Sequence, residues 1–230
     1  MIATNLHAVT DRIAQACASA GRAAGSVQLL AVSKTFGPDA VQQAFDAGQH
    51  AFGENYIQEA VDKITALSAL PIEWHCIGPI QSNKTRLVAE HFQWVHTVDR
   101  LKIAQRLSDQ RPAHLPPLQV CIQVNVDGGS TKSGVAPQDA AALAAAVAAL
   151  PRLQVRGLMC IPEFAPDFIA ARAVFMSAKA IFDAIVEQGV PLDTLSMGMS
   201  GDLDAAIAGG STMVRVGSAI FGARYYPGKV

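Results

Sequence analysis

The 230-residue sequence has few of the features that mark membrane, secreted or nucleic-acid-binding proteins. It contains no run of about 18 uninterrupted apolar residues, the length that a membrane-spanning helix needs, and its Ala-rich stretch 140–150 is too short. Its 18 Lys and Arg residues oppose 19 Asp and Glu residues, for a formal net charge of −1, and they form no basic block. We therefore expect a globular protein whose partners include neither membranes nor nucleic acid.

Cysteines are also scarce, and the four present lie far apart, at positions 17, 76, 121 and 160. They form no C-x-x-C pair and have no nearby histidine pair at metal-binding spacing, so no metal site is expected. Three of them lie in apolar runs typical of strands, which predicts buried free thiols in a reducing compartment. Residues 1–16 lack the basic start and continuous apolar core of a signal peptide. Both observations predict a cytoplasmic protein.

What the sequence does contain is a regular alternation of short apolar runs and longer amphipathic ones. An opening helix is predicted from Ile2, Leu6, Val9 and Ile13, whose spacing of three or four residues forms one apolar face, and Gly21 ends it. Helices are also predicted to begin near positions 38, 56, 80, 101, 137, 166 and 201, with a short one after the last strand. The predicted strands are 27–33, 49–54, 72–78, 94–99, 118–126, 154–161, 194–198 and 213–218.

Eight apolar strands, each followed by a helix, predict a closed parallel (β/α)8 barrel of the TIM type with an extra N-terminal helix. The alternative is a doubly wound sheet, which usually carries a G-x-G turn after its first strand. The turn here is SKTFGPD (33–39), which has no such glycine pair. No linker, charge run or change of composition divides the chain, so residues 1–230 are predicted to form one domain.

In a barrel of this kind the active site lies at the C-terminal ends of the strands. Lys34 follows the first predicted strand at that end. Burial lowers the pKa of a lysine amine and favours the uncharged form that attacks a carbonyl to give a Schiff base. The alternative is a strand-end lysine that extends its charged group to solvent.

The last two strands end in polar turns that predict a phosphate site. Ser200 follows the seventh strand, and Arg215, Gly217 and Ser218 end the eighth. The loops after these two strands commonly hold a phosphate in such barrels, where backbone N–H groups point at the anion. The alternative is that Ser200 only caps the next helix, with Asp202 favouring the helix dipole.

Two further residues are weaker candidates. Asn55 follows the second strand and could hydrogen-bond a ligand, although a turn-forming Asn is equally consistent with its position. His75 lies inside the third strand, where a core histidine with satisfied hydrogen bonds is the preferred interpretation.

Six segments, spread over nearly the whole chain, resemble the sequence of a known protein family. They are LLAVSK (29–34), FGENYIQEA (52–60), EWHCIGPIQSNK (73–84), TKSG (131–134), RGLMCIP (156–162) and LSMGMSGDLDAAIAGGSTMVRVGSAIFGAR (195–224). In order and content they resemble the YggS/PROSC family of pyridoxal phosphate homeostasis proteins. That family is related in fold to the N-terminal barrel of alanine racemases.

The resemblance implies a site for pyridoxal 5′-phosphate (PLP). Lys34 would form the Schiff base with the cofactor, and Arg215 would face its pyridine nitrogen. Ser200, Gly217 and Ser218 would hold the phosphate.

The resemblance also implies that Asn55 and Met199 line the PLP ring, and that His75 and Ile77 lie near the cofactor. One departure from the family pattern stands out: Phe36 occupies a position where many relatives have a second lysine. Any secondary role of that position is therefore in doubt here.

Arg215 also bears on the reaction class. Arginine only donates hydrogen bonds, so it would keep the pyridine nitrogen unprotonated and the ring a weak electron sink. Two-base racemisation needs a second acid or base, and Tyr225 and Tyr226, at the end of the chain, are not expected to reach the site. We therefore expect a protein that holds PLP and contributes to vitamin B6 homeostasis without substantial catalysis.

The alternatives are a weak PLP-dependent amino-acid racemase and a cofactor-free barrel enzyme that uses Lys34 on a phosphorylated sugar or acid. Apo-enzymes that depend on PLP would be transient partners, and a monomer or weak homodimer is expected. The sequence leaves open whether Lys84 or Lys132 forms secondary adducts with PLP.

Overall fold

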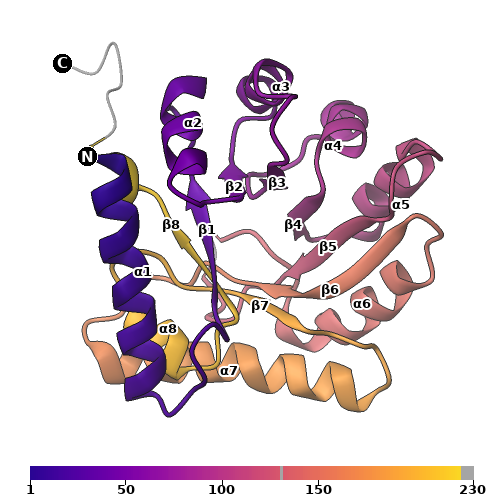
Figure 1. The fold of residues 1–230 in the computed structure, drawn as a ribbon. Coiled ribbons are helices and arrows are strands. Elements are labelled where there is room, and N and C mark those ends of the chain that lie inside the picture. The colour runs from indigo at the N-terminus through magenta and orange to yellow at the C-terminus, as the bar shows by residue number, and fades with distance from the viewer. Residues whose placement is uncertain (130–131, 224–230) are drawn as a thin grey trace.

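A computed structural model describes residues 1–129 and 132–223 of the chain. Its eight parallel strands close into a barrel in chain order, with β8 returning to pair with β1 (Figure 1). Each strand overlaps one predicted run, so the (β/α)8 barrel is confirmed and the open doubly wound sheet is wrong. The strands are β1 (Gln28–Val32), β2 (Ala51–Glu54), β3 (Glu73–Cys76), β4 (Trp94–Val98), β5 (Leu118–Gln123), β6 (Leu153–Met159), β7 (Thr194–Ser196) and β8 (Met213–Val216).

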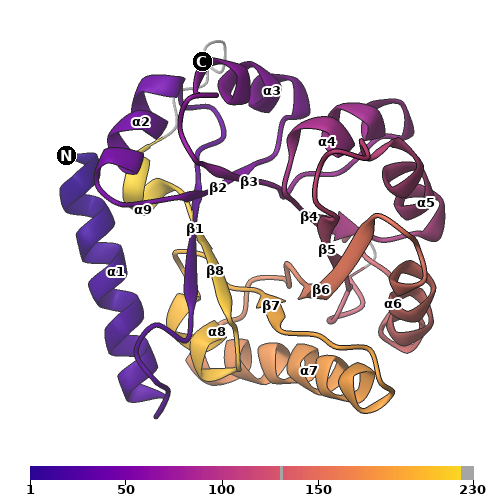
Figure 2. The ribbon, with the colours of Figure 1, turned by 45° about the vertical axis from the view of Figure 1, so that its right-hand side comes forward.

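Helices surround the barrel (Figure 2). They are α1 (Ile2–Ser19), α2 (Pro38–Asp46), α3 (Ile57–Ala66), α4 (Thr85–His91), α5 (Leu101–Gln110), α6 (Ala140–Ala148), α7 (Phe168–Glu187), α8 (Leu203–Ala208) and α9 (Ser218–Phe221). The predicted starts near 80 and 137 correspond to short 3-10 turns, Ser82–Lys84 and Pro137–Asp139, that precede α4 and α6. The start near 166 falls two residues later, because the Asp167 side chain accepts the N–H of Ala170 at 2.8 Å and fixes α7 to begin at Phe168.

The N-terminal helix completes the outer wall of the barrel. Between β8 and residue 223, where the described part of the chain ends, the structure forms α9, a helix of four residues, which is too short to cover the strands beside it. The 18-residue α1 packs against α8, α9 and α2 and covers this region (Figure 1). Its buried residues include Leu6, Val9 and Ile13, three of the positions that predicted its apolar face.

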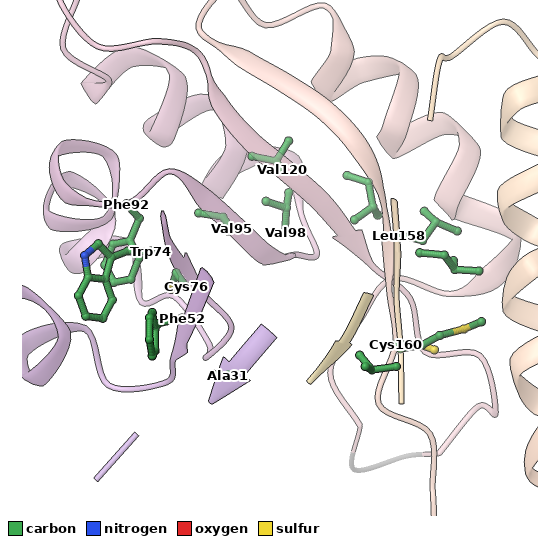
Figure 3. Close-up of a cluster of buried hydrophobic side chains, with 14 of the residues drawn as sticks. Ala31, Phe52, Trp74, Cys76, Phe92, Val95, Val98, Val120, Leu158 and Cys160 are labelled. Atoms are coloured by element: carbon green, nitrogen blue, oxygen red, sulfur yellow. The ribbon is translucent and has the colours of Figure 1, made fainter. Parts of the chain in front are cut away.

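The main hydrophobic core lies between the strands and the helices. Figure 3 shows Phe52, Val95 and Leu158, three of its buried side chains, on the strands of the barrel. All four cysteines are buried free thiols, which confirms that prediction. Within the described part of the chain, none of the helices has both the length and the hydrophobicity needed to cross a membrane.

The interior of the barrel is different in character, because its inward side chains are partly polar. On one side Leu30, Ala51, Ile77 and Met213 form a small apolar cluster with Val32. The remaining interior includes the buried side chains of a histidine on β3, a histidine on β4, a serine on β7 and an arginine on β8. Successive residues of a strand face opposite sides, so these polar groups share the inner surface with the aliphatic ones.

Candidate functional site

A cavity of about 200 Å³ lies at the C-terminal ends of the barrel strands. It brings together eight of the nine residues that were predicted to bind the cofactor. Two aliphatic residues that sequence reasoning did not identify also line it, and only the period-two alternation of their strands could have pointed to them. The lining residues are Val32, Lys34, Asn55, Ile77, Ile161, Met199, Ser200, Arg215, Gly217 and Ser218.

Lys34 enters the cavity from a turn that is held on both sides. Thr35 has a φ of 70°, in the left-handed region that a β-branched residue rarely adopts. Its N–H donates to Glu59 Oε1 at 2.7 Å, which stabilises this unusual conformation. The residue on the other side, Ser33, is fully buried and pairs through its N–H with Gly53 O at 3.1 Å. The backbone that carries Lys34 is therefore fixed before and after the lysine.

A buried ion-pair cluster beneath this turn explains how it is held. Lys63 Nζ lies 2.8 Å from Glu54 Oε1 and 2.6 Å from Glu59 Oε1, and it donates to the carbonyl oxygen of Ser33 at 2.8 Å. The Ser33 hydroxyl also donates to Glu54 Oε1, at 2.6 Å. Burial raises the pKa of Glu54 above its usual value, and Lys63 opposes that shift. The cluster links α3 to the end of β1.

Arg215 forms the floor of the cavity and is 5% exposed. One terminal nitrogen donates to Ser196 O at 2.7 Å and to Ser196 Oγ at 2.8 Å, and the other donates to Cys160 O at 3.0 Å. Within the described residues the Nε–H has no hydrogen-bond partner. Because an arginine carries five N–H donors, this one can still serve a ligand with an acceptor atom above the floor.

The loop after β7 forms one side of the rim. Gly198 has a φ of 95°, and a Cβ there would lie 2.4 Å from the Cβ of Ala206, so only glycine fits. The N–H of Met199 donates to Asp202 Oδ1 at 2.6 Å. Asp202 is the N-cap residue of α8, so the interpretation of Ser200 as the helix cap is wrong. The hydroxyl of Ser200 therefore remains available at the rim.

The N-terminal helix braces both rim loops from outside. Arg12 donates to the carbonyl oxygen of Ser200 at 2.8 Å and pairs with Asp204 at 2.5 Å. Asn5 donates to the carbonyl oxygen of Ile220, in α9, at 2.9 Å. The loop that carries Ser200 and the short helix that begins with Ser218 are thus tied to one element.

Phe36 connects the first loop of the site to the last helix. Its ring stacks on that of Phe221, with centroids 5.2 Å apart and an interplanar angle of 29°. A lysine at position 36 could not make this contact. The aromatic side chain instead packs the loop after β1 onto α9, which begins with Ser218.

His75 does not line the cavity. It lies on β3, two residues before Ile77 in the chain and one layer deeper in the barrel, and is fully buried. Both ring nitrogens form hydrogen bonds, to His96 and to Glu73, at 2.9 Å each. This geometry agrees with a core histidine and not with direct contact to a ligand. Lys84 and Lys132 do not line the cavity either.

Asn55 carries an unsatisfied acceptor in the cavity. Its Oδ1 is buried and has no hydrogen-bond partner among the described residues. Such an atom costs free energy unless a donor reaches it, which a hydroxyl or imine N–H of a ligand could do. Close packing holds the residue, since a Cβ on Gly78 would lie 2.1 Å from the carbonyl oxygen of Asn55.

Taken together, the cavity presents an amine, a donor cation and an unpaired acceptor in its depth, with two serine hydroxyls at its rim. These groups match an aromatic aldehyde that carries a ring nitrogen, a ring hydroxyl and a phosphate. A larger cavity of about 290 Å³ lies beside it, between residues 162–168, α7 and α8, and contains none of the predicted site residues. Tyr225 and Tyr226 lie outside the described residues.

Comparisons with known proteins agree with this geometry. Residues 4–225 match the family described as alanine racemase, N-terminal domain. The chain is 58% identical over 225 residues to the pyridoxal phosphate homeostasis protein of Pseudomonas aeruginosa, with 98% of this chain and 96% of that protein covered. A crystal structure of an unknown protein from Bifidobacterium adolescentis is similar at a TM-score of 0.89 and 37% identity, covering 95% of this chain and 94% of that chain.

A further solved structure was determined with the cofactor. PipY of Synechococcus elongatus, with PLP bound, has a TM-score of 0.80 and 37% identity, covering 91% of this chain and all of that chain (100%). The chain therefore belongs to the alanine racemase N-terminal domain family and, within it, to the pyridoxal phosphate homeostasis proteins.

Proposed function

We propose that this chain binds PLP in the cavity above Arg215 and holds it as a Schiff base on Lys34. The observation that carries the proposal is the convergence of Lys34, Ser200 and the Arg215–Ser218 segment on one cavity, although they come from three separate parts of the sequence. The relatives named above, one of them solved with PLP bound, support the same assignment.

Each group has a distinct role in this proposal. The Lys34 amine holds the aldehyde carbon, with loss of one water. Arg215 directs an N–H at the pyridine nitrogen, and Ser200, Ser218 and the backbone of Gly217 hold the phosphate. Asn55 Oδ1 accepts a hydrogen bond from the cofactor, while Ile77 and Met199 pack against the ring.

The same residues favour holding the cofactor over turning over a substrate. Bound PLP supplies an electron sink for amino-acid chemistry, and Arg215 weakens that sink because it cannot protonate the ring nitrogen. Among the described residues that line the cavity, only Lys34 and Arg215 have ionisable side chains, and arginine does not release its proton near neutral pH. Two-base racemisation needs a second such group on the opposite face. We infer a role in PLP homeostasis, with transient transfer of the cofactor to apo-enzymes.

The test is a titration of the apo-protein with PLP, followed by exchange measurements on the loaded protein. We expect a visible absorption band that saturates at one PLP per chain. We expect no exchange of the α-proton of alanine or serine above that given by free PLP. Rapid exchange would replace the homeostasis role with that of a weak racemase. Failure to take up PLP would overturn the cofactor assignment and leave the phosphorylated-sugar alternative.

Three further parts of the proposal rest on the sequence. We place the protein in the cytoplasm, as one domain over residues 1–230, and as a monomer or weak homodimer. Sedimentation of the full chain at several concentrations measures the last of these directly.

A further inference from the structure

A continuous chain of hydrogen bonds crosses the interior of the barrel and ends on Arg215. It begins at Glu73, whose Oε1 lies 2.9 Å from His75 Nε2. His75 Nδ1 lies 2.9 Å from His96 Nε2, and His96 Nδ1 lies 2.9 Å from Ser196 Oγ. Arg215 then donates to the same Ser196 oxygen at 2.8 Å. The four links connect β3, β4, β7 and β8.

With both imidazoles neutral, the Glu73 end fixes the direction of every hydrogen bond in this chain. A carboxylate only accepts, so His75 carries its proton on Nε2 and donates to Glu73. His75 Nδ1 then accepts from His96 Nε2, and His96 Nδ1 accepts from the Ser196 hydroxyl. The Ser196 oxygen has two lone pairs, so it also accepts from Arg215, which can only donate.

Both imidazoles are neutral in this arrangement. Each is fully buried, and burial lowers the pKa of His75 and places that of His96 well below the usual value. A second proton on His75 Nδ1 would oppose the N–H of His96 Nε2, so this direction of the hydrogen bonds belongs to the neutral state of both rings. The hydrogen bond from His75 lowers the pKa of Glu73, which keeps that carboxylate ionised.

The chain of hydrogen bonds from Glu73 to Arg215 does not conduct protons to the cavity. A proton wire needs a terminal group that can release and regain a proton, and arginine does not do so near neutral pH. What the chain supplies is orientation and charge balance. No carboxylate within the described residues forms an ion pair with Arg215, and a buried cation without compensation is costly. The aligned dipoles of Ser196, His96 and His75 provide part of that compensation.

We propose that Glu73, His75, His96 and Ser196 are positioning residues for Arg215, and that they aim its guanidinium into the cavity through one directed chain of hydrogen bonds. In this proposal the position of the Arg215 guanidinium depends on a residue at the opposite mouth of the barrel, Glu73, whose side chain is 42% exposed. It rests on the proposed function only where Arg215 meets the cofactor. The direction of the chain can be tested without any ligand.

The first experiment is ¹⁵N NMR of the histidines in the apo-protein, with His75 and His96 assigned from the signals lost in His75→Gln and His96→Gln. We expect both rings to carry their proton on Nε2 alone, and to stay neutral from pH 7.5 to 5.5. A proton on Nδ1 of either ring, or an imidazolium in this range, would overturn the proposal.

The second experiment measures the Kd for PLP in variants along the chain. Ser196→Ala removes one hydrogen bond to Arg215 but leaves its two contacts with backbone carbonyls, and we expect the Kd to rise about tenfold. Cys121→Ala is the matched control, because it deletes one atom from a residue that is also fully buried beside Trp94 inside the barrel. That control should bind as tightly as the wild type.

Glu73 gives the most specific comparison because it lies far from the cavity. Glu73→Met removes the terminal acceptor, and we expect the Kd to rise about threefold. In Glu73→Gln the amide oxygen still accepts from His75, so this variant should bind as the wild type does. Equal affinities in Glu73→Met and wild type, or equal losses in Met and Gln variants, would contradict a positioning role.

The two experiments separate the proposals from each other. If the wild type takes up no PLP, the proposed function fails, and the NMR result still decides the direction of the chain. If PLP binds normally while the histidines carry the opposite tautomers, only the positioning role fails. Circular dichroism melting curves of each variant confirm that the comparison is made between folded proteins.

Discussion

The guanidinium of Arg12 donates to the carbonyl oxygen of Ser200 at 2.8 Å, although 188 residues separate the two in the chain. The first helix and the loop after β7 are thereby joined at the outer wall of the barrel. Ser200 lines the cavity, so the helix that closes the barrel also positions a residue that is predicted to bind the phosphate. The extra helix is part of the construction of the site.

This contact predicts a selective loss of phosphate binding in Arg12→Met. Without the brace, the loop that carries Ser200 loses one charged hydrogen bond, and we expect the Kd for PLP to rise about threefold. The Kd for pyridoxal, which lacks the phosphate, should not change. Arg86→Met is the control, because Arg86 forms an exposed pair with Glu90 on α4. Equal effects of the two variants would show that Arg12 does not act on the phosphate loop.

The two rim serines should each bind the phosphate directly. Ser200→Ala and Ser218→Ala remove a hydroxyl that donates to a charged oxygen, and we expect each to raise the Kd for PLP about tenfold. Affinity for pyridoxal should stay within about twofold of the wild type. Ser177→Ala, on the exposed face of α7, serves as the control. A parallel loss of pyridoxal affinity would place the serines against another part of the ligand.

Lys63 should be important for stability because its partners are buried. Lys63→Met leaves the carboxylate of Glu54 buried without its cation, and the fully buried Oε2 of that residue already lacks a partner within the described part. Breaking a buried pair in this way costs about 3–5 kcal/mol of unfolding free energy. Lys179→Met breaks an exposed pair with Asp183 and should cost less than about 1 kcal/mol. Urea unfolding curves measure both, and similar losses would contradict the account of the cluster.

The buried histidines predict a loss of stability in mild acid. His75 and His96 have lowered pKa values in the folded protein, whereas in the unfolded chain they titrate near 6.5. The stability that they contribute to the folded protein is therefore present above about pH 6.5. It is lost as the pH falls, because the unfolded chain then binds protons that the folded chain does not. Each histidine can contribute up to about 1.4 kcal/mol per pH unit.

Glu54 works in the opposite direction. Its pKa is raised by burial, so its protonation stabilises the folded state as the pH falls. The effect of Glu54 on stability opposes that of the two histidines, which together are larger. We therefore expect the unfolding free energy to drop by about 1 kcal/mol or more between pH 7.5 and 5.5. The double variant His75→Gln/His96→Gln should show a flatter profile. An unfolding free energy that is constant or rising toward pH 5.5 would rule out two neutral buried imidazoles.

Much of the fold could be predicted from the sequence, because strands buried on both faces are continuous apolar runs and the helices between them keep helical spacing. The positions of Lys34, Ser200 and Arg215 followed from one rule, that strand ends of a parallel barrel meet at one mouth. That rule identifies residues near the mouth but does not say how deep a side chain lies. His75 was included with the cofactor ligands because of the family resemblance, and it does not line the cavity.

The contacts that organise the site from a distance were not predictable in the same way. Arg12 meets Ser200 only because α1 closes the barrel beside α8, and no local pattern encodes that distance. The hydrogen-bond chain corresponds to only a weak pattern in the sequence. In E-W-H (73–75) and W-V-H (94–96), the first and third residues face the same side of their strand, which places His75 beside Glu73 and His96 beside Trp94. Which strand they would face across the barrel depends on closure and register.

The most direct test of the central claim is to locate the covalent bond to PLP. The PLP-loaded protein is reduced with borohydride, digested and analysed by mass spectrometry, beside Lys34→Ala, Lys84→Ala and Lys132→Ala. We predict a stable pyridoxyl phosphate adduct on Lys34, retained when Lys84 or Lys132 is replaced and lost together with the visible absorption band in Lys34→Ala. An adduct confined to another lysine, or an unchanged band in Lys34→Ala, would contradict the assignment of Lys34 as the residue that holds the cofactor.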